Sequence, residues 1–205
     1  MSFIKMIKDG LAKAFSKGAE AGSQQVMERS EPMFCYQCEQ AAKGEGCTRV
    51  GICGKQPEVS DLQDLLIYAL KGLSIYAVAG RKVGVVDQEV NVFTCEALFS
   101  TLTNVNFDQE RVADLTRRAV AMRDSLRGKV KGAGGAVESS HDAATFKLES
   151  TMDGMVAQSA RAGLKADASI NPDILSLEHI LLFGLKGVAA YADHAHILGQ
   201  EDDSV

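Results

Sequence analysis

Apolar residues recur at helical spacing along most of this chain, and no segment alternates apolar and polar residues as a strand does. The widest apolar stripe follows Pro57 and comprises Leu62, Leu65, Leu66, Ala69, Leu70, Leu73 and Ala77. Ser60 and Gln63 have the spacing of a capping box, with Gln63 at the N3 position. We expect this box to mark the start of the helix.

The rest of the chain continues the helical pattern. The spacing predicts three further helices, over about residues 88–104, 108–127 and 152–162. A glycine-rich linker is expected from Gly128 to Ser140. The triplet Asn171-Pro172-Asp173 predicts the start of a long final helix that ends near Leu198. The fold class that follows is all-α.

An internal repeat relates the helix after Pro57 to the final helix. Leu62–Ala77 aligns without gaps with Leu177–Ala192, and both copies contain Leu-Lys-Gly followed by Tyr-Ala at the same offset. Two helices follow the first copy, whereas a short polar segment follows the second. We expect one three-helix bundle plus a partial second bundle, divided into residues 1–32, 33–130 and 131–205.

The unfinished repeat also predicts an assembly. The final helix has an apolar stripe too wide for one neighbour, including Leu177, Leu181, Val188 and Tyr191. Burying one such side chain is worth roughly 1.5–3 kcal/mol, so an uncovered stripe favours association. We expect an oligomer, formed with copies of the chain or with another subunit.

Residues 2–17 form a lysine-rich amphipathic pattern, predicted as a helical extension within residues 1–32. This helix could pack on the rest of the chain, dock on a partner, or make peripheral contact with a membrane surface. No transmembrane segment is predicted, because no stretch approaches eighteen apolar residues without a charge. No secretory signal is recognisable either.

The composition indicates the cellular compartment but does not identify a partner. The 205 residues have a net charge of −5 with interspersed signs, and no basic stripe indicates nucleic acid. Only five residues are cysteine, and four of them lie close together rather than spread along the chain as in a disulfide scaffold. We expect a cytoplasmic protein.

The four clustered cysteines are Cys35, Cys38, Cys47 and Cys53, with the spacing C-x2-C-x8-C-x5-C in a glycine-rich loop. A structural zinc site usually has two short C-x2-4-C pairs, and the second pair here is too widely spaced. Iron–sulfur clusters tolerate uneven spacing. The spacing alone favours an iron–sulfur cluster over zinc, and zinc over disulfides. Cys95, within a predicted helix, is more typical of a small buried apolar residue.

The cysteine run resembles the hybrid-cluster protein family, also called prismane proteins or hydroxylamine reductases. The resemblance covers about residues 33–199 and rests on Met33–Gln40, Gly46–Thr48, Gly51–Lys55, Leu62–Ile67, Leu98–Asn106 and Gly184–Ala192. It implies that Cys35, Cys38, Cys47 and Cys53 hold one [4Fe–4S] cluster, with [2Fe–2S] as the alternative found in some relatives. It also implies an iron–sulfur loop followed by helical bundles.

Family members are much longer, and their catalytic hybrid cluster is bound by further α/β domains whose ligands have no counterpart in these residues. The resemblance therefore leaves open whether this chain is an enzyme, and it indicates no catalytic residue here. The favoured hypothesis is an electron-transfer module that relays electrons to a redox partner or catalytic subunit. The alternative is a non-enzymatic iron–sulfur scaffold or redox sensor that docks on a partner or membrane.

Overall fold

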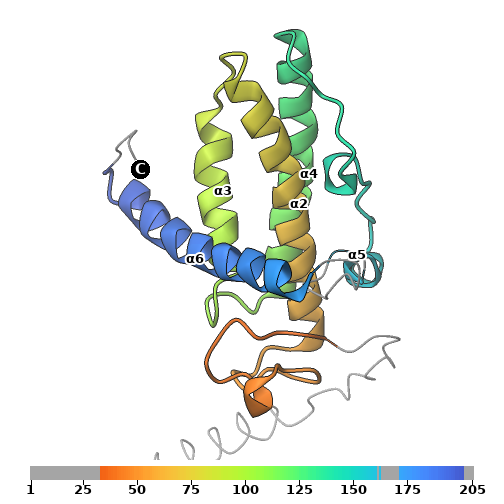
Figure 1. Ribbon diagram of the computed structural model, residues 1–205, viewed down its shortest axis with the longest axis vertical. Coiled ribbons are helices and arrows are strands. Elements are labelled where there is room, and N and C mark those ends of the chain that lie inside the picture. The colour runs from red at the N-terminus through yellow and green to blue at the C-terminus, as the bar shows by residue number, and fades with distance from the viewer. Residues whose placement is uncertain (1–32, 161, 163–170, 201–205) are drawn as a thin grey trace, which may run out of the picture. The chain divides into compact units, whose positions relative to one another are not determined.

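The computed structural model describes residues 33–160, 162 and 171–200 (Figure 1). This part of the chain contains α2 (Pro57–Arg81), α3 (Gln88–Ser100), α4 (Gln109–Gly132), α5 (Met152–Ser159) and α6 (Pro172–Ile197), with the 3-10 turns η1 (Ala42–Gly44) and η2 (Asp142–Ala144). No strand occurs among these residues, so the predicted all-α class is confirmed. The helix expected over residues 2–17 lies outside the described residues.

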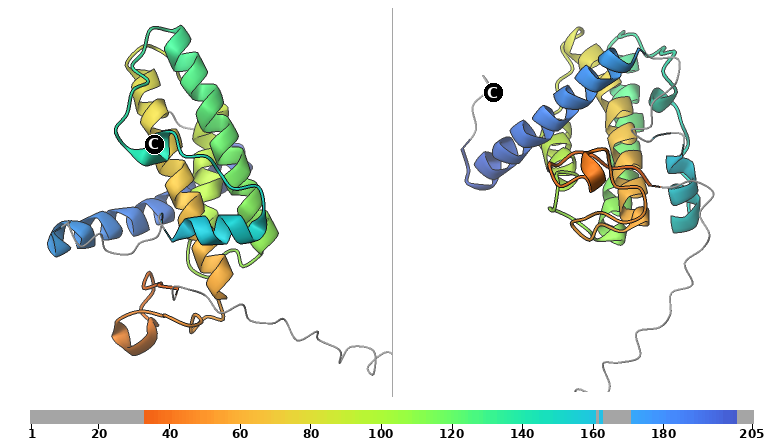
Figure 2. Two further views of the ribbon diagram at one scale, coloured as in Figure 1. Left: turned by 90° about the vertical axis from the view of Figure 1, so that its right-hand side faces the viewer. Right: turned by 60° about the horizontal axis from the view of Figure 1, so that its bottom comes forward.

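The core forms around α2, which packs along α4 and contacts α3, α5 and η2 (Figures 1 and 2). Its leucine stripe lies inside this packing. Fully buried members of the core include Leu62, Leu65, Leu66, Ala69, Leu73, Tyr76, Val112 and Ala119. Each buried leucine stabilises the fold by roughly 1.5–3 kcal/mol. The predicted three-helix bundle therefore has a buried apolar core, and the described residues belong to one compact unit. The division near residue 130 stays a prediction.

Most helix starts follow from local capping. The side chains of Asp87, Asp108 and Asn171 accept backbone N–H groups at the starts of α3, α4 and α6. The capping box predicted at Ser60 is wrong, because α2 begins three residues earlier with Pro57 in its first turn. Ser60 is buried within the helix, and the Gln63 side chain bonds to partners outside it.

Two helix ends also differ from expectation. α3 ends at Ser100 rather than near residue 104, and the segment that follows turns at Asn104, whose φ is +62°. α4 extends to Gly132, so the first residues of the expected glycine-rich linker are helical. Gly134, with a φ of +77°, then provides the left-handed conformation that lets the chain turn after the helix.

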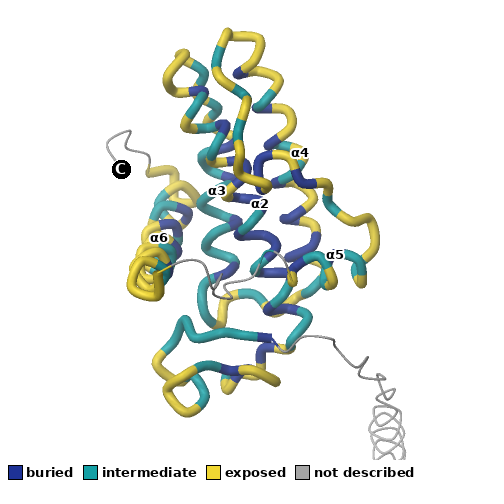
Figure 3. Tube along the Cα trace, turned by 45° about the vertical axis from the view of Figure 1, so that its right-hand side comes forward, coloured by how far each residue is buried: buried dark blue, intermediate teal, exposed yellow. Residues whose placement is uncertain are grey.

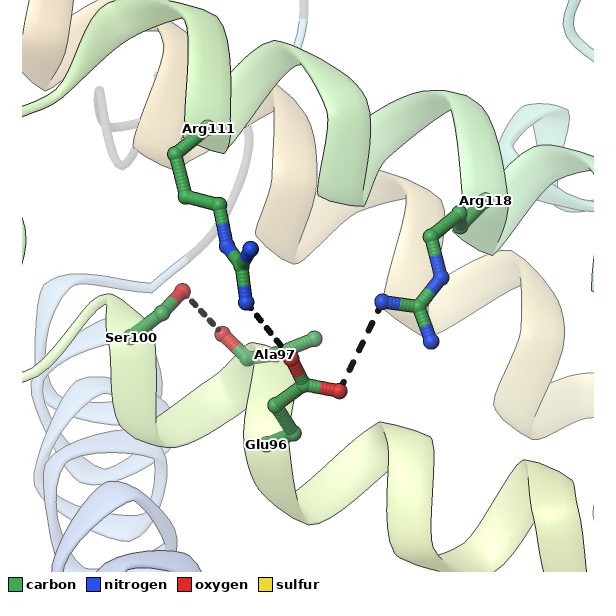
Figure 4. A network of polar contacts seen from close by, with 5 residues as sticks. All are labelled: Glu96, Ala97, Ser100, Arg111 and Arg118. Carbon is green, nitrogen blue, oxygen red and sulfur yellow. Dashed lines mark hydrogen bonds and ion pairs between the residues drawn. The ribbon is translucent and has the colours of Figure 1, made fainter.

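Two ion pairs connect α3 to α4 at the protein surface. Glu96 lies between Arg111 and Arg118, at 3.2 Å and 3.6 Å respectively (Figure 4). On α3 itself, the Ser100 hydroxyl donates to the Ala97 carbonyl. Because both arginines are more than half exposed, each pair contributes no more than about 1 kcal/mol. Apolar packing therefore dominates this contact.

The final helix α6 packs against α3 with its polar side inward. His179, Lys186, Ala189 and Asp193 are its buried residues. Its exposed large apolar residues are Ile174, Leu177, Ile180, Leu181, Leu185, Val188, Tyr191 and Ile197 (Figure 3). The described residues thus leave uncovered the stripe that an amphipathic helix normally buries.

By length and composition alone, α2 and α6 could each cross a membrane. Core helices of soluble proteins meet the same criterion, and α2 is such a core helix. α6 differs, because only 17% of its most apolar window is buried. The expectation that no transmembrane segment is present therefore stays a prediction.

Candidate iron–sulfur centre

Backbone pairing fixes two of the four clustered cysteines. Cys35 and Cys47 form an isolated antiparallel bridge, in which each N–H donates to the carbonyl of the other at 3.0 Å and 2.8 Å. Between them the chain turns through η1, where Lys43 and Gly44 both have positive φ. This bridge holds cysteines twelve residues apart in sequence side by side.

Glycines shape the turn around Cys53. The N–H of Gly51 donates to the Lys55 carbonyl and that of Gly54 to the Gly51 carbonyl, both at 2.8 Å. A Cβ at Gly51 would lie 2.9 Å from Cys53 Sγ and 3.1 Å from Lys55 Cβ. Gly54 has a φ of +89°, which a residue with a side chain rarely adopts. The turn therefore requires glycine at position 51 because neighbouring atoms approach closely, and at position 54 because φ is positive.

All four clustered cysteines line one cavity, and their thiols form no disulfide in the structure. The opposite wall comes from the segment between α3 and α4, with Leu102, Thr103, Asn104 and Phe107. Cys47 is buried and the other three are half-buried. The loop lies where α2 begins, so the rigid end of the bundle supports it (Figures 1 and 2).

The sulfur arrangement provides a test of which metal group fits. No three His, Cys, Asp or Glu side chains among the described residues are grouped so as to hold one metal ion. A zinc ion would require sulfurs about 2.3 Å from a single point. All four cysteines line one small cavity, and four cysteine thiolates are the usual ligands of an iron–sulfur cluster. The donor set, four thiols in a glycine-shaped cradle, fits an iron–sulfur cluster.

Cys95 does not line this cavity. It lies on α3, where burial, and secondarily the negative charge of Asp193, raise the pKa of its thiol. A raised pKa disfavours the thiolate that a metal ligand requires. Cys95 is half-buried rather than buried, and its structural role stays a prediction.

Polar side chains surround one sulfur in particular. The ammonium of Lys55 donates to Cys35 Sγ at 3.3 Å and to Gln63 Oε1 at 3.1 Å. Gln63 in turn donates to the Asn106 carbonyl at 2.9 Å. The Gln37 amide approaches the same sulfur at 4.0 Å and donates to the Thr101 carbonyl at 3.3 Å.

The first contact between the cysteine loop and α6 is made by the buried ammonium group of Lys186. Lys186 Nζ donates to Gln37 Oε1 at 3.3 Å and to the Thr101 carbonyl at 3.1 Å. Only 2% of this lysine is exposed. Burial lowers its pKa to about 8, against an opposing attraction from Asp64. Lys71, its counterpart in the internal repeat, is exposed, so the repeat itself could not identify the buried lysine.

The second contact is aromatic. The Tyr36 hydroxyl hydrogen-bonds to His179 Nδ1, and its ring packs edge-on against Phe183 at 5.7 Å. Burial raises the pKa of Tyr36, while desolvation and then the nearby charge of Lys71 lower that of His179. Both shifts favour the neutral forms. Sequence spacing gave no sign of this pair, because its members are 143 residues apart.

The burial of Lys186 predicts an unusual dependence of stability on pH. Its pKa is about 8 when folded and about 10.4 in an unfolded chain. The unfolded chain therefore binds more protons between these values, and the free energy of unfolding rises with pH across this window, by about 3 kcal/mol from this group. Urea unfolding of anaerobically purified protein at pH 7.5 and pH 10 should reveal the rise.

Lys186→Met should remove most of that rise, whereas Lys71→Met, which deletes the exposed counterpart, should keep it. An undiminished rise in Lys186→Met would contradict this assignment.

Known proteins match this chain from the cysteine loop onward. The model of the prismane/CO dehydrogenase family matches residues 33–205. The hydroxylamine reductase of Syntrophobacter fumaroxidans is 66% identical over 173 residues. Those of Methanocella arvoryzae and Solidesulfovibrio magneticus are 56% and 51% identical over 174 residues.

Each alignment covers 84% of this chain but only 31–32% of the relative. The chain thus spans about a third of the length of these relatives. The matched residues include all four clustered cysteines and every described helix. The chain belongs to the prismane/CO dehydrogenase family, whose members bind iron–sulfur clusters.

Proposed function

We propose that Cys35, Cys38, Cys47 and Cys53 bind one [4Fe–4S] cluster. The observation that carries this proposal is the single cavity lined by all four cysteines. A [2Fe–2S] cluster is the alternative, because it also takes four cysteine ligands. When bound, either cluster would supply one-electron transfer. The chain's own residues would hold it, donate a hydrogen bond to one sulfur and limit solvent access through the α3–α4 segment.

The proposed role is electron relay to a catalytic site outside these residues. Membership of the family, and relatives that are named hydroxylamine reductases, support a role in an oxidoreductase. Within the described residues, no three His, Cys, Asp or Glu side chains are grouped so as to hold one metal ion, and outside the loop no cluster of such residues offers a second site. The remaining two-thirds of a relative's length is the natural source of that chemistry. The cysteine-rich loop is suited to a reducing compartment, so we also propose a cytoplasmic location.

The uncovered apolar face of α6 is evidence that the proposed relay binds a partner. Leu177, Leu181 and Tyr191 are between 63% and 82% exposed, whereas Lys186 on the opposite side is buried. The relatives are about three times as long as this chain. A protein part corresponding to their remaining two-thirds would cover this apolar face if it packed against α6. We propose this catalytic part, in the same or another polypeptide, as the native occupant of the α6 face.

A redox-sensing role is the second candidate, and one specific observation favours it. Lys186 and the Tyr36–His179 pair connect the cysteine loop directly to α6. A change in the loop on cluster loss could therefore alter the helix that carries the apolar face. Partner binding that differs between cluster-loaded and cluster-free protein would support this candidate. Equal binding by both forms, together with electron exchange, would support relay.

The relay proposal predicts little intrinsic catalysis. With a strong artificial electron donor, the purified chain should reduce hydroxylamine at no more than the rate of donor, buffer and free iron. A full-length hydroxylamine reductase, such as that of Syntrophobacter fumaroxidans, is the positive control in the same assay of ammonia formation. Turnover that depends on the cluster and exceeds background would show that these residues contain a catalytic site.

A further inference from the structure

Lys55 is the one lysine of the cysteine loop that is withdrawn from water. It is 5% exposed, whereas Lys43 in the same loop is exposed. The ammonium of Lys55 donates to Cys35 Sγ at 3.3 Å, so its charge lies directly beside a proposed ligand sulfur. Its two partners are a sulfur and a neutral amide. The positive charge therefore lies at the wall of the cavity, withdrawn from water.

Gln63 fixes the direction of that charge. Its amide oxygen accepts from Lys55 at 3.1 Å and its amide nitrogen donates to the Asn106 carbonyl at 2.9 Å. The side chain is 3% exposed and extends from α2, a helix anchored in the core. The ammonium is thus held toward Cys35 Sγ by a rigid element and not by the loop alone.

We propose that Lys55 sets the reduction potential of the iron–sulfur centre through its charged hydrogen bond to Cys35, with Gln63 as the residue that positions it. This inference rests on the proposed binding of a cluster by the four cysteines. Reduction adds one electron, and hence one negative charge, to the centre. A nearby cation and an N–H donor to a ligand sulfur stabilise the reduced form more than the oxidised form. Lys55 accordingly raises the potential.

The test is an anaerobic redox titration followed by electron paramagnetic resonance. Lys55→Met keeps the length and apolar stem of the side chain but removes the charge and the donor. The equilibrium constant for reduction should fall at least tenfold, which for one electron is a shift of about 59 mV to lower potential. Lys43→Met removes the same formal charge from an exposed position and should shift the constant less than about twofold, because solvent screens exposed charges. Lys55→Arg should recover part of the wild-type potential.

Iron and acid-labile sulfide, measured first, separate the two claims. Wild-type protein without a cluster would defeat the proposed function itself. A cluster-bearing Lys55→Met protein whose potential equals that of the wild type would overturn the role of Lys55 alone. If Lys55→Met does not assemble a cluster, Lys55→Gln and Gln63→Leu are titrated in its place. Unchanged potentials in both would overturn the proposal, and lowered potentials would support it.

Discussion

Replacing any one of Cys35, Cys38, Cys47 or Cys53 by alanine should remove most of the cluster iron from anaerobically purified protein. Each of these residues lines a single cavity, and Cys95 does not line it. Changes to outer-shell residues alone cost about 10–100-fold in metal affinity, so loss of a ligand should cost more than about tenfold. Bound iron and the visible thiolate-to-iron absorption measure the effect.

Cys95→Ala is the matched control, since it also removes one thiol but from α3, outside the cavity. It should retain wild-type iron content and absorption. Full iron retention in two or more of the four loop variants would contradict the proposed ligand set. Cluster loss in Cys95→Ala, with the helical content unchanged, would do the same.

The purified chain should self-associate through α6 when no other partner is present. Leu177 and Leu181 lie one helical turn apart, are 66% and 63% exposed, and contact water where a helix normally contacts a core. The double change Leu177→Glu with Leu181→Glu should raise the dissociation constant of the oligomer by roughly 100-fold or more. This magnitude follows from loss of about 1.5–3 kcal/mol per buried leucine. Size-exclusion chromatography with light scattering measures the mass.

Val86→Glu provides the control, because Val86 is 63% exposed but lies between α2 and α3, away from α6. It should associate as the wild type does, while the α6 variant should be monomeric with unchanged helical content. A wild-type monomer at micromolar concentration that binds no hydrophobic dye would show that the chain covers this face itself.

Local chemistry explains why most of the helical architecture could be predicted. The final helix was expected to start at Asn171-Pro172-Asp173, and the cap at Asn171 places it there. The same kind of local signal failed at Ser60. There Pro57 is already compatible with a first helical turn, and Gln63 bonds to Lys55 and Asn106 instead of capping. A capping motif competes with such tertiary partners, and the sequence does not reveal them.

The sequence also predicts part of the candidate iron–sulfur centre. Four cysteines at short, uneven spacing predict the sulfur donors that we propose, and the structure places all four at one cavity. Their polar surroundings were not predictable, because Lys186 reaches Gln37 across 149 residues. Hydrophobic periodicity also predicts that the apolar stripe of α6 belongs to an interface, but it does not say which protein would cover it. The polar inner face of that helix follows only from its packing against α3 and the loop.

The central claim is that the four loop cysteines hold one four-iron cluster, and Mössbauer spectroscopy of the chain loaded with ⁵⁷Fe tests it most directly. Anaerobically purified protein should contain about four irons and four sulfides per chain, with spectral parameters of a [4Fe–4S] cluster. Two irons with two sulfides would instead assign the [2Fe–2S] alternative. One zinc ion per chain without iron would contradict the account.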